Sequence, residues 1–306
     1  MNPEVFLDRV PDYRSASRAV SNILDRIGPP LRPGDRVLVK PNLVAGKNAR
    51  LSCTRPEVVV GVCAYLKDHG VRICVADSPA FGSAAGVASA AGMIGPLAEL
   101  GLEVETLKTG VTRRLQASNV VLSCAALEAD LILNLPRFKA HSQMRVTAGV
   151  KNLFGCVTGM RKALLHATHG DKGNRFQALI VDILLELPPQ VTIIDGITGM
   201  HGTGPIDGQA YSLGLLAGSA STVAVDTTMY RVLGLSGHEV PVWEECLQRG
   251  LSGADPDRIS YPNLHPESVR VDDFRIPRSL KPQSFSPPRL LLSTLRRLWK
   301  QCRSCR

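Results

Sequence analysis

The chain has 306 residues, of which 44% are hydrophobic, and it carries a formal net charge of +9. This length is enough to bury a substantial core. No run of about 18 apolar residues occurs, so we expect no membrane-spanning helix. The first 16 residues contain acidic residues and prolines where a secretory signal would need a basic flank and an apolar block, and we therefore expect a cytoplasmic protein.

The excess positive charge lies at one end of the chain. Nine Lys and Arg residues and no acidic residue occur between Arg275 and Arg306, whereas acidic and basic residues balance in the first 274. A body without net charge is not expected to bind nucleic acid, because such binding depends on neutralising phosphates. Any role that depends on charge is therefore expected in the last 32 residues.

Strand and helix patterns alternate along the first 250 residues. The predicted strands are 36–40, 71–76, 102–107, 131–135, 191–194 and 212–217. The predicted helices are 56–68, which Thr54 could cap, 84–100, 173–187, 221–233 and 240–249. Strands separated by helices of this length predict an α/β fold with a mostly parallel or mixed sheet and helices on both faces. A division into two lobes, with the pocket between them, stays open.

The composition changes near residue 272, which predicts two regions. Residues 1–272 are expected to form the α/β domain, and residues 273–306 a basic linker and tail rich in Pro and Arg. In the tail, Leu291, Leu295, Leu298 and Trp299 fall near one helical face with arginines elsewhere. Such a helix suits an anionic membrane surface or an acidic partner, and the alternative is a helix packed on the body.

One predicted strand is followed by a cluster of basic side chains. No acidic residue occurs between Asp130 and Asp171, a stretch that contains glycines suited to close backbone approach. A cluster of one sign beside a core strand predicts a pocket for a small anionic ligand, and the alternative is a basic surface loop. The basic residues of this stretch that could bear on a ligand are Lys139, His141, Lys151, Lys162, His166 and His169.

Side-chain chemistry gives these residues candidate roles. Crowded lysines can gain basicity, and histidines exchange protons near neutral pH. The candidate catalytic residues are Lys139, His141, Lys151 and His166. The candidate substrate-binding residues are Lys40, Asn42, Asn152, Lys162, Gly204 and Gly208. Asp77 and Asp195 follow predicted strands and could bind a divalent cation or position a lysine, and turn capping is the alternative for each.

Several segments, in consistent order over residues 35 to 235, carry a resemblance to a known family. They are VLVKPNLV around Lys40, TRPEVVVGV around Pro56, VADSP at Asp77, ADLILNLPRFKAHSQMRVTAGVKNLFG, the His166 segment, IIDGITGMHGTGPIDG and AVD at Asp226. On these segments the chain resembles the domain of unknown function 362 family. The resemblance implies no established activity, but in many members a ferredoxin-like module with two four-iron clusters follows this domain.

The sequence departs from that pattern at its end. A cluster-binding module opens with Cys-x-x-Cys-x-x-Cys, whereas this sequence ends after Cys302 and Cys305. We therefore do not expect an iron–sulfur cluster within this chain alone. The pair is expected to be a remnant of cluster ligands, and a site shared between two chains or a redox dithiol are the alternatives.

The basic segment also resembles, more distantly, the nickel-pincer lactate racemases. His141, Lys151 and His166 follow the order and approximate spacing of a histidine, a lysine and a histidine in that family. The resemblance implies that the lysine holds the cofactor and that the histidines shuttle a proton next to a carboxylate. This chain lacks the paired glycines that precede the lysine in that family, which leaves the cofactor unassigned.

These observations favour an enzyme that performs acid–base chemistry, with or without a divalent metal, on a small anionic substrate in a pocket lined by Lys and His. Two alternatives stay open: an iron–sulfur accessory protein whose cluster module is lost or supplied by a partner, and an anion-binding module without catalysis. The expected partners are the small anionic ligand and, through residues 275–306, a ferredoxin-like or other acidic protein or an anionic membrane surface.

Overall fold

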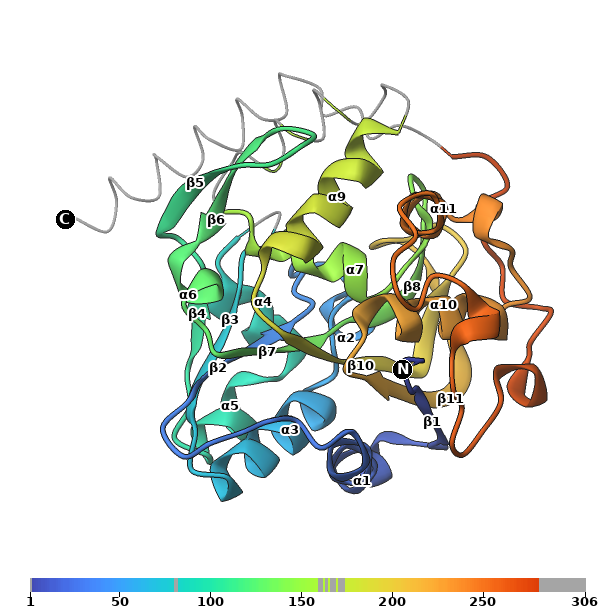
Figure 1. The fold of residues 1–306 in the computed structure, drawn as a ribbon. Coiled ribbons are helices and arrows are strands. Elements are labelled where there is room, and N and C mark those ends of the chain that lie inside the picture. Colours follow the sequence, from blue (N-terminus) through green and yellow to red (C-terminus); the bar gives the residue numbers. More distant parts are fainter. Residues whose placement is uncertain are drawn as a thin grey trace.

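The structure confirms the predicted α/β class. The computed structural model describes residues 2–79, 82–158, 162, 165, 169 and 174–280. Within these residues, a nine-stranded sheet crosses the molecule, with helices on both of its faces (Figure 1). The strand order is β1-β11-β10-β7-β2-β3-β4, and β8 and β9 extend from β10.

The centre of the sheet is parallel and contains five of the six predicted strands, whereas the sixth, 212–217, belongs to an antiparallel strand. Its strands are β2 (Arg36–Pro41), β3 (Arg72–Asp77), β4 (Val104–Thr106), β7 (Leu131–Leu135) and β10 (Gln190–His201). β2 pairs with both β3 and β7, β3 pairs with β4, and β7 pairs with β10. The carboxyl ends of these strands therefore meet at one edge, where ligands bind in sheets of this kind.

Antiparallel pairs complete the mixed sheet. β11 (Gln209–Ser219) lies between β10 and β1 (Phe6–Arg9) and runs antiparallel to both. β8 (Arg137–His141) runs parallel to β10 and antiparallel to β9 (Arg145–Thr147). A separate two-stranded sheet consists of β5 (Gly110–Arg114) and β6 (Asn119–Ser123).

Two groups of helices cover the sheet (Figure 1). The first group comprises α1 (Ala16–Ile27), α2 (Ala49–Ser52), α3 (Pro56–Asp68), α4 (Ala84–Ala91) and α5 (Ile94–Ala98). The second comprises α6 (Cys124–Leu127), α7 (Gly149–Asn152), α9 (Arg175–Glu186), α10 (Thr222–Val232) and α11 (Pro241–Gln248). Each group packs on one face of the sheet, because the side chains of a buried strand point alternately to the two faces.

Two local expectations need correction. The single helix predicted over 84–100 is two helices, because Gly92 ends α4 in the left-handed conformation at φ 81°. No strand was predicted in the basic segment that follows residues 131–135, whereas β8 begins there at Arg137. In addition, β1 and α1 were not predicted, although α1 shows buried residues at helical spacing.

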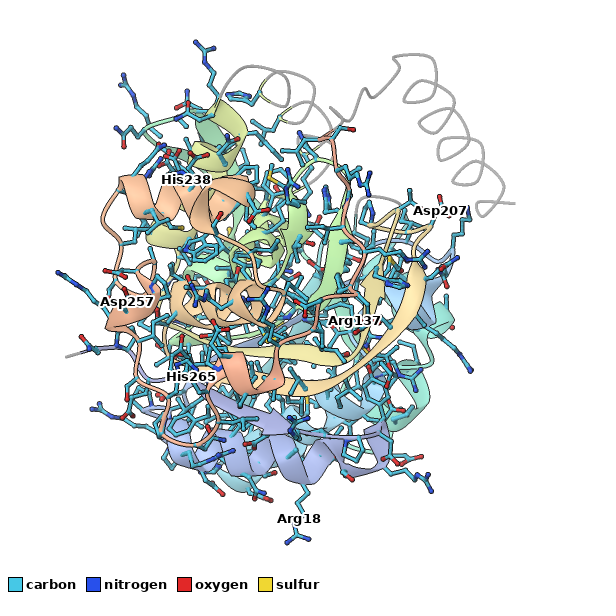
Figure 2. The ribbon with its side chains drawn as sticks, turned by 90° about the vertical axis from the view of Figure 1, so that its right-hand side faces the viewer. Arg18, Arg137, Asp207, His238, Asp257 and His265 are labelled. Atoms are coloured by element: carbon cyan, nitrogen blue, oxygen red, sulfur yellow. The ribbon has the colours of Figure 1, made fainter. Side chains whose placement is uncertain are left out.

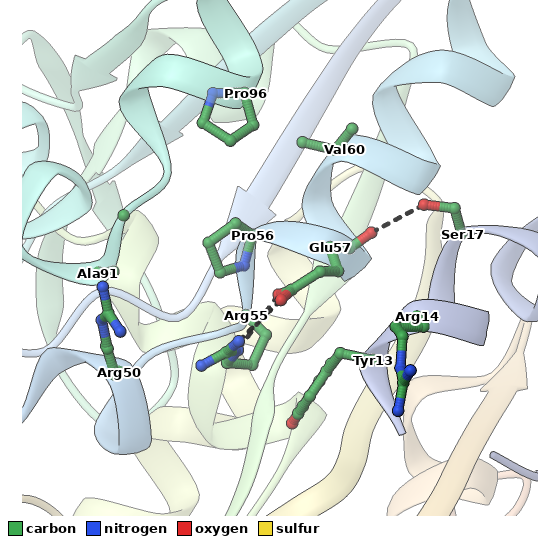
Figure 3. A pocket seen from close by; sticks show the side chains of 11 residues that line it. Tyr13, Arg14, Ser17, Arg50, Arg55, Pro56, Glu57, Val60, Ala91 and Pro96 are labelled. Atoms are coloured by element: carbon green, nitrogen blue, oxygen red, sulfur yellow. Dashed lines mark hydrogen bonds and ion pairs between the residues drawn. The ribbon is translucent and has the colours of Figure 1, made fainter. Parts of the chain in front are cut away.

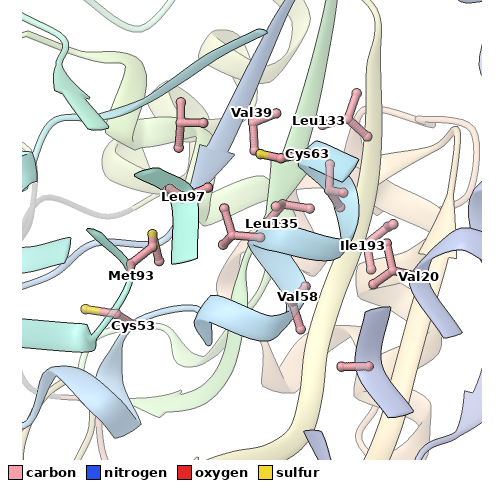
Figure 4. Packing of buried hydrophobic residues seen from close by; sticks show 14 of the residues in the cluster. Val20, Val39, Cys53, Val58, Cys63, Met93, Leu97, Leu133, Leu135 and Ile193 are labelled. Atoms are coloured by element: carbon pink, nitrogen blue, oxygen red, sulfur yellow. The ribbon is translucent and has the colours of Figure 1, made fainter. Parts of the chain in front are cut away.

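The alternation of strand residues also locates the polar interior. Val39, Leu133 and Leu135 point toward the first helix group and pack with Val58 and Cys63 of α3 (Figure 4). Leu38 and Ile132 point toward the second group. Two residues further along the same strands, this second face changes from apolar to polar side chains.

The end of the described chain lies against the body. The Phe274 ring is 5.7 Å from that of Phe138 and 5.1 Å from that of Tyr211, measured between centroids. Residues 281–306 lie outside the described residues, and with them the predicted amphipathic helix. In the part of the chain that is described, no helix has the length and apolar content needed to cross a bilayer.

Candidate functional site

Three neighbouring strands place polar residues side by side at their carboxyl ends. Lys40 of β2 is the register partner of Asn134 of β7, which in turn pairs with Thr192 of β10. The Asn134 amide nitrogen donates to Thr192 Oγ1 at 3.1 Å and to the Gly149 carbonyl at 3.1 Å. All three side chains are fully buried, so the sheet offers a polar floor inside the protein.

The short helix α7 lies over this floor and is held there by Asp226 of α10. The Asp226 carboxylate accepts hydrogen bonds from the backbone nitrogens of Gly149 at 2.6 Å and Val150 at 2.9 Å. Burial raises the pKa of Asp226 to about 7, against the opposing effect of these two hydrogen bonds. Asn152, at the other end of α7, donates to Asn134 Oδ1 at 2.8 Å, so α7 is tied to both the sheet and α10.

Lys40 and Asp77 form an ion pair in the interior, with Nζ and Oδ1 2.8 Å apart. The side chains are 0% and 3% exposed. The other oxygen of Asp77 accepts from the Leu43 backbone nitrogen at 2.8 Å. Gly155 lies against the pair, because a Cβ atom added there would come within 2.3 Å of Lys40 Nζ and 2.4 Å of Asp77 Oδ1.

β8 directs alternate side chains to the polar side of the protein. Phe138 and Ala140 enter an apolar cluster, whereas Arg137, Lys139 and His141 point the other way. The Lys139 ammonium group donates to Asn42 Oδ1 and, at 2.8 Å, to the Ser52 carbonyl. Burial beside neutral oxygens lowers its pKa to about 8.

His141 is held as a neutral imidazole. Its Nδ1 atom accepts hydrogen bonds from the backbone nitrogens of Gln143 at 3.1 Å and Met144 at 3.3 Å. Burial lowers the pKa of His141 well below its ordinary value, and the charges of Lys151 and Lys139 lower it further. Since the accepting nitrogen carries no proton, Nε2 holds the proton and can donate it.

Lys151 of α7 and Lys162 complete the basic group. The Lys151 ammonium lies 4.4 Å from the Phe154 ring centroid and 5.3 Å from that of Phe176. Burial lowers the pKa of Lys151 to about 7, and the charges of Lys162, Lys139 and Lys40 add to this effect. Lys162 donates to the carbonyls of Ser78 and, at 3.1 Å, Gly155, and burial lowers its pKa to about 8.

We call Lys40, Lys139, Lys151 and Lys162 the lysine cluster. Among the described residues, Asp77 is the one carboxylate that accepts a hydrogen bond from it. Four ammonium groups around one carboxylate leave an excess of positive charge in a region that water reaches poorly. A bound anion would relieve that excess, and the lowered pKa values leave part of the cluster able to accept protons near neutral pH.

Asp195 lies in a different arrangement, a buried ion pair with Arg137. The Arg137 Nη1 and Asp195 Oδ2 atoms are 2.5 Å apart, and the two side chains are at most 1% exposed. Figure 2 labels Arg137 among the elements of the fold. Asp195 also accepts from the Tyr13 hydroxyl at 2.9 Å and from the Arg55 backbone nitrogen at 3.1 Å. Asp77 and Asp195 thus each have a cationic partner, and the described residues contain no group of three or more His, Cys, Asp or Glu side chains that could hold a metal ion.

The remaining predicted site residues either lie in the 202–208 loop or fall outside the described residues. Gly204 packs against β8, since a Cβ atom there would come within 1.8 Å of the Ala140 carbonyl oxygen, and a Cβ on Gly208 would meet the Met200 side chain at 2.5 Å. Close packing therefore accounts for the presence of glycine at both positions. His166, Cys302 and Cys305 lie outside the described residues.

Asn134, Asp226, Arg137 and Tyr13 were not among the predicted site residues. The alternation in Arg-Phe-Lys-Ala-His at 137–141 could have revealed both β8 and the inward direction of Arg137. Asn134 stands out as the single polar residue in a buried strand. No sequence signal connects Tyr13 with Asp195, which lies 182 residues away.

Comparison with known proteins identifies the family. The model of the family described as Domain of unknown function (DUF362) matches residues 37–231. The chain belongs to this family. It is 36% identical over 307 residues to the thylakoid-associated protein sll1697 of Synechocystis sp. (strain ATCC 27184 / PCC 6803 / Kazusa), an alignment that covers 98% of this chain and 95% of the relative.

Two solved structures are also similar to the DUF362 chain. One is the lactate racemase apoprotein from Thermoanaerobacterium thermosaccharolyticum, with a TM-score of 0.42 and 11% identity, covering 72% of this chain and 54% of that one. The other is a protein from Thermotoga maritima, with a TM-score of 0.39 and 10% identity, covering 68% of this chain and 55% of that one. The chain thus spans about half the length of each of these two proteins.

Proposed function

We propose that this chain is an enzyme that transfers a proton on a small anionic substrate bearing a carboxylate or a related group. The observation that carries the proposal is the lysine cluster, which has four buried or partly buried ammonium groups and one carboxylate. Unpaired buried cations destabilise a protein, so such an excess is expected where an anion binds.

Lys139 and Lys162 would hold the anionic group of the substrate. Each now donates to uncharged oxygens, from Asn42 and Ser52 in one case and from Ser78 and Gly155 in the other. A substrate carboxylate would offer a stronger, charged acceptor. Lys40 is engaged by Asp77 and would contribute through its charge and through the position of Asn152.

Lys151 and His141 would perform the proton transfer. With a pKa of about 7, Lys151 is partly deprotonated at neutral pH and can act as a base. His141 remains neutral, and its Nε2–H can donate a hydrogen bond to the oxygen on which negative charge develops. The aromatic rings beside Lys151 attract its ammonium form, but burial and the charges of the neighbouring lysines outweigh this effect and lower its pKa, which supports its role as the base.

Two measurements test this proposal. Oxalate binding by calorimetry reports on the anion site, and deuterium incorporation from D2O next to the carboxylate of glycolate, glycerate and succinate, followed by NMR, reports on proton transfer. In Lys151→Met we expect oxalate binding at least about tenfold weaker, which is about 1.4 kcal/mol, and no exchange. Lys67→Met removes an exposed lysine of α3 and should change neither. Oxalate binding that depends on Lys151, without exchange of any of the three acids, would favour the non-catalytic alternative.

The pH dependence gives a second test. A base with a pKa near 7 becomes active as the pH rises through that value, whereas the anion site weakens as Lys139 and Lys162 lose their charge near pH 8. We expect a narrow bell-shaped profile of exchange rate with limbs near these two values. His141→Gln should lower the rate constant more than the affinity. An unchanged rate in this variant would contradict the role given to His141.

A further inference from the structure

A second charged hollow lies on the side of the sheet covered by the first helix group. It has a volume of about 440 Å³, within the usual range for small-molecule sites. Its walls come from η1 (Tyr13–Ser15), α1, α2, the first turns of α3 and the α4–α5 segment (Figure 3). The residues that line it are Tyr13, Arg14, Ser17, Arg50, Arg55, Pro56, Glu57, Val60, Ala91, Gly92 and Pro96. None of them belongs to the lysine cluster, so we call this hollow the arginine groove.

The charges around the arginine groove are not balanced. Of its three guanidinium groups, Arg55 is paired with Glu57, the one acidic residue of the lining, at 2.7 and 3.2 Å. Partial burial would raise the pKa of Glu57, but the hydrogen bonds from Arg55 outweigh this effect and lower it. Arg14 has a loose contact at 3.3 Å with Asp12 in solvent, and Arg50 forms no ion pair or hydrogen bond within the described residues. Arg50 is therefore the one guanidinium group of the lining without an acidic partner among the described residues, and the lining as a whole carries two more positive than negative charges.

The groove is also rigid and partly apolar. The Tyr13 hydroxyl is held in place by two hydrogen bonds, since it donates to Asp195 and accepts from Arg137. The Arg55 guanidinium lies 4.6 Å from the centre of the Tyr13 ring. Val60, Ala91 and Pro96 add apolar surface. A site with fixed walls and both apolar and cationic groups suits an organic anion better than an inorganic ion.

We propose that the arginine groove binds the phosphate group of a phosphate monoester, with the organic part of the ligand against Tyr13, Val60 and Pro96. The lining has three arginines and one glutamate, and this excess of two positive charges matches the charge of a phosphate dianion, while the N–H donors of the Arg50 guanidinium match its oxygens. A carboxylate carries a single negative charge and would balance half of this excess.

Calorimetric titration with glycerol 3-phosphate tests the proposal, with glycerol as the uncharged control. Arg50→Ala should weaken binding at least about tenfold. Arg18→Ala removes the same charge from the neighbouring α1 but from a side chain that points away from the body, and it should leave the affinity within about twofold (Figure 2). Glu57→Gln releases Arg55 and should strengthen binding several-fold. Lys151→Met should leave binding unchanged, which separates this site from the one proposed above.

The phosphate could belong to a free metabolite or to a lipid headgroup, and vesicles containing phosphatidate distinguish these sources. Binding of glycerol 3-phosphate that depends on Arg50 supports a free ligand, and vesicle binding alone that depends on Arg50 supports a headgroup. If Arg18→Ala weakens binding as much as Arg50→Ala, the effect is that of a general positive field and the proposal is wrong. The proposal is equally overturned if neither probe binds at millimolar concentration to a protein with an unchanged melting temperature.

Discussion

Arg137 and Lys139 lie two residues apart on one side of β8, yet their charges have different partners. Arg137 meets the Asp195 carboxylate at 2.5 Å and the Tyr13 hydroxyl, so its charge is matched within the fold. Lys139 meets the uncharged oxygens of Asn42 and Ser52, and its pKa is lowered to about 8. The first arrangement resembles a structural pair, whereas the second leaves a charge available for a ligand.

The difference teaches how to separate structural from functional charges in a protein of this kind. A matched buried pair contributes little net stability, but removing one partner leaves an uncompensated charge and is costly. An unmatched buried lysine already destabilises the fold, so its removal should change the free energy of unfolding little and should weaken ligand binding at the proposed site greatly. Each prediction below tests one side of this comparison.

The largest effect is expected for Asp195→Asn. The substitution keeps the shape of the side chain but leaves Arg137, which is 1% exposed, without its carboxylate. We expect the free energy of unfolding to fall by about 3–5 kcal/mol, measured by urea denaturation. A loss below about 1 kcal/mol would show that the pair is not structural and would remove the basis of the comparison.

Gly155→Ala should break the one matched pair within the lysine cluster. The new Cβ atom would overlap Lys40 Nζ and Asp77 Oδ1, both held tightly in the interior. We expect a loss of roughly 1–3 kcal/mol in urea denaturation. Gly95→Ala is the matched control, because no atom lies within 4 Å of a Cβ at that position. Equal stability of the two variants would contradict the packing described for Gly155.

The lysine cluster should make stability depend on pH. Lys151 has a pKa of about 7 in the folded chain and about 10.4 when unfolded, so between these values the unfolded chain binds more protons. The free energy of unfolding should therefore rise by about 1–2 kcal/mol from pH 7 to 8.5. The raised pKa of Asp226 acts below pH 7 and has the opposite sign. Urea denaturation of Lys151→Met should show a smaller rise, and Lys67→Met the full one.

The smallest effect is expected at an exposed pair. Asp207 lies 2.6 Å from Lys47, and the side chains are 65% and 74% exposed. Solvent screens such a pair, so Asp207→Asn should change the free energy of unfolding, measured by urea denaturation, by about 0.5 kcal/mol or less. A larger loss would mean that this contact holds the 202–208 loop in place, and the loop would then need to be tested as part of the ligand site.

Much of the fold followed from local patterns. The strands at 36–40 and 131–135 are continuous apolar runs ended by turn residues, and such runs form buried parallel strands with little dependence on their surroundings. The interruption at Gly92 and the continuation through Pro136 into β8 were not predicted. The first has a local cause, since Gly92 takes the left-handed conformation, whereas β8 depends on its pairing with β10 and β9.

The candidate site was predictable in part for the same reason. Residues that follow neighbouring parallel strands meet at one edge of the sheet, and the sequence analysis could therefore group Lys40, Asp77 and Lys139. It could not distinguish Asp77 from Asp195. Both follow a predicted strand, although Asp77 ends β3 and Asp195 lies within β10 in the structure. Their partners come from β2 in one case and from β8 and η1 in the other.

The sequence by itself determined the α/β class, the family and the one-signed basic segment after β7, because composition and periodicity are properties of neighbouring residues. Only the tertiary structure decided which charges are matched. Asp195 neutralises Arg137, Asp226 holds the turn that presents Lys151, and three lysines of the cluster have no carboxylate hydrogen-bonded to them within the described residues. Charge balance depends on distance and on exclusion of water, and neither is fixed until segments that lie far apart in the sequence come together.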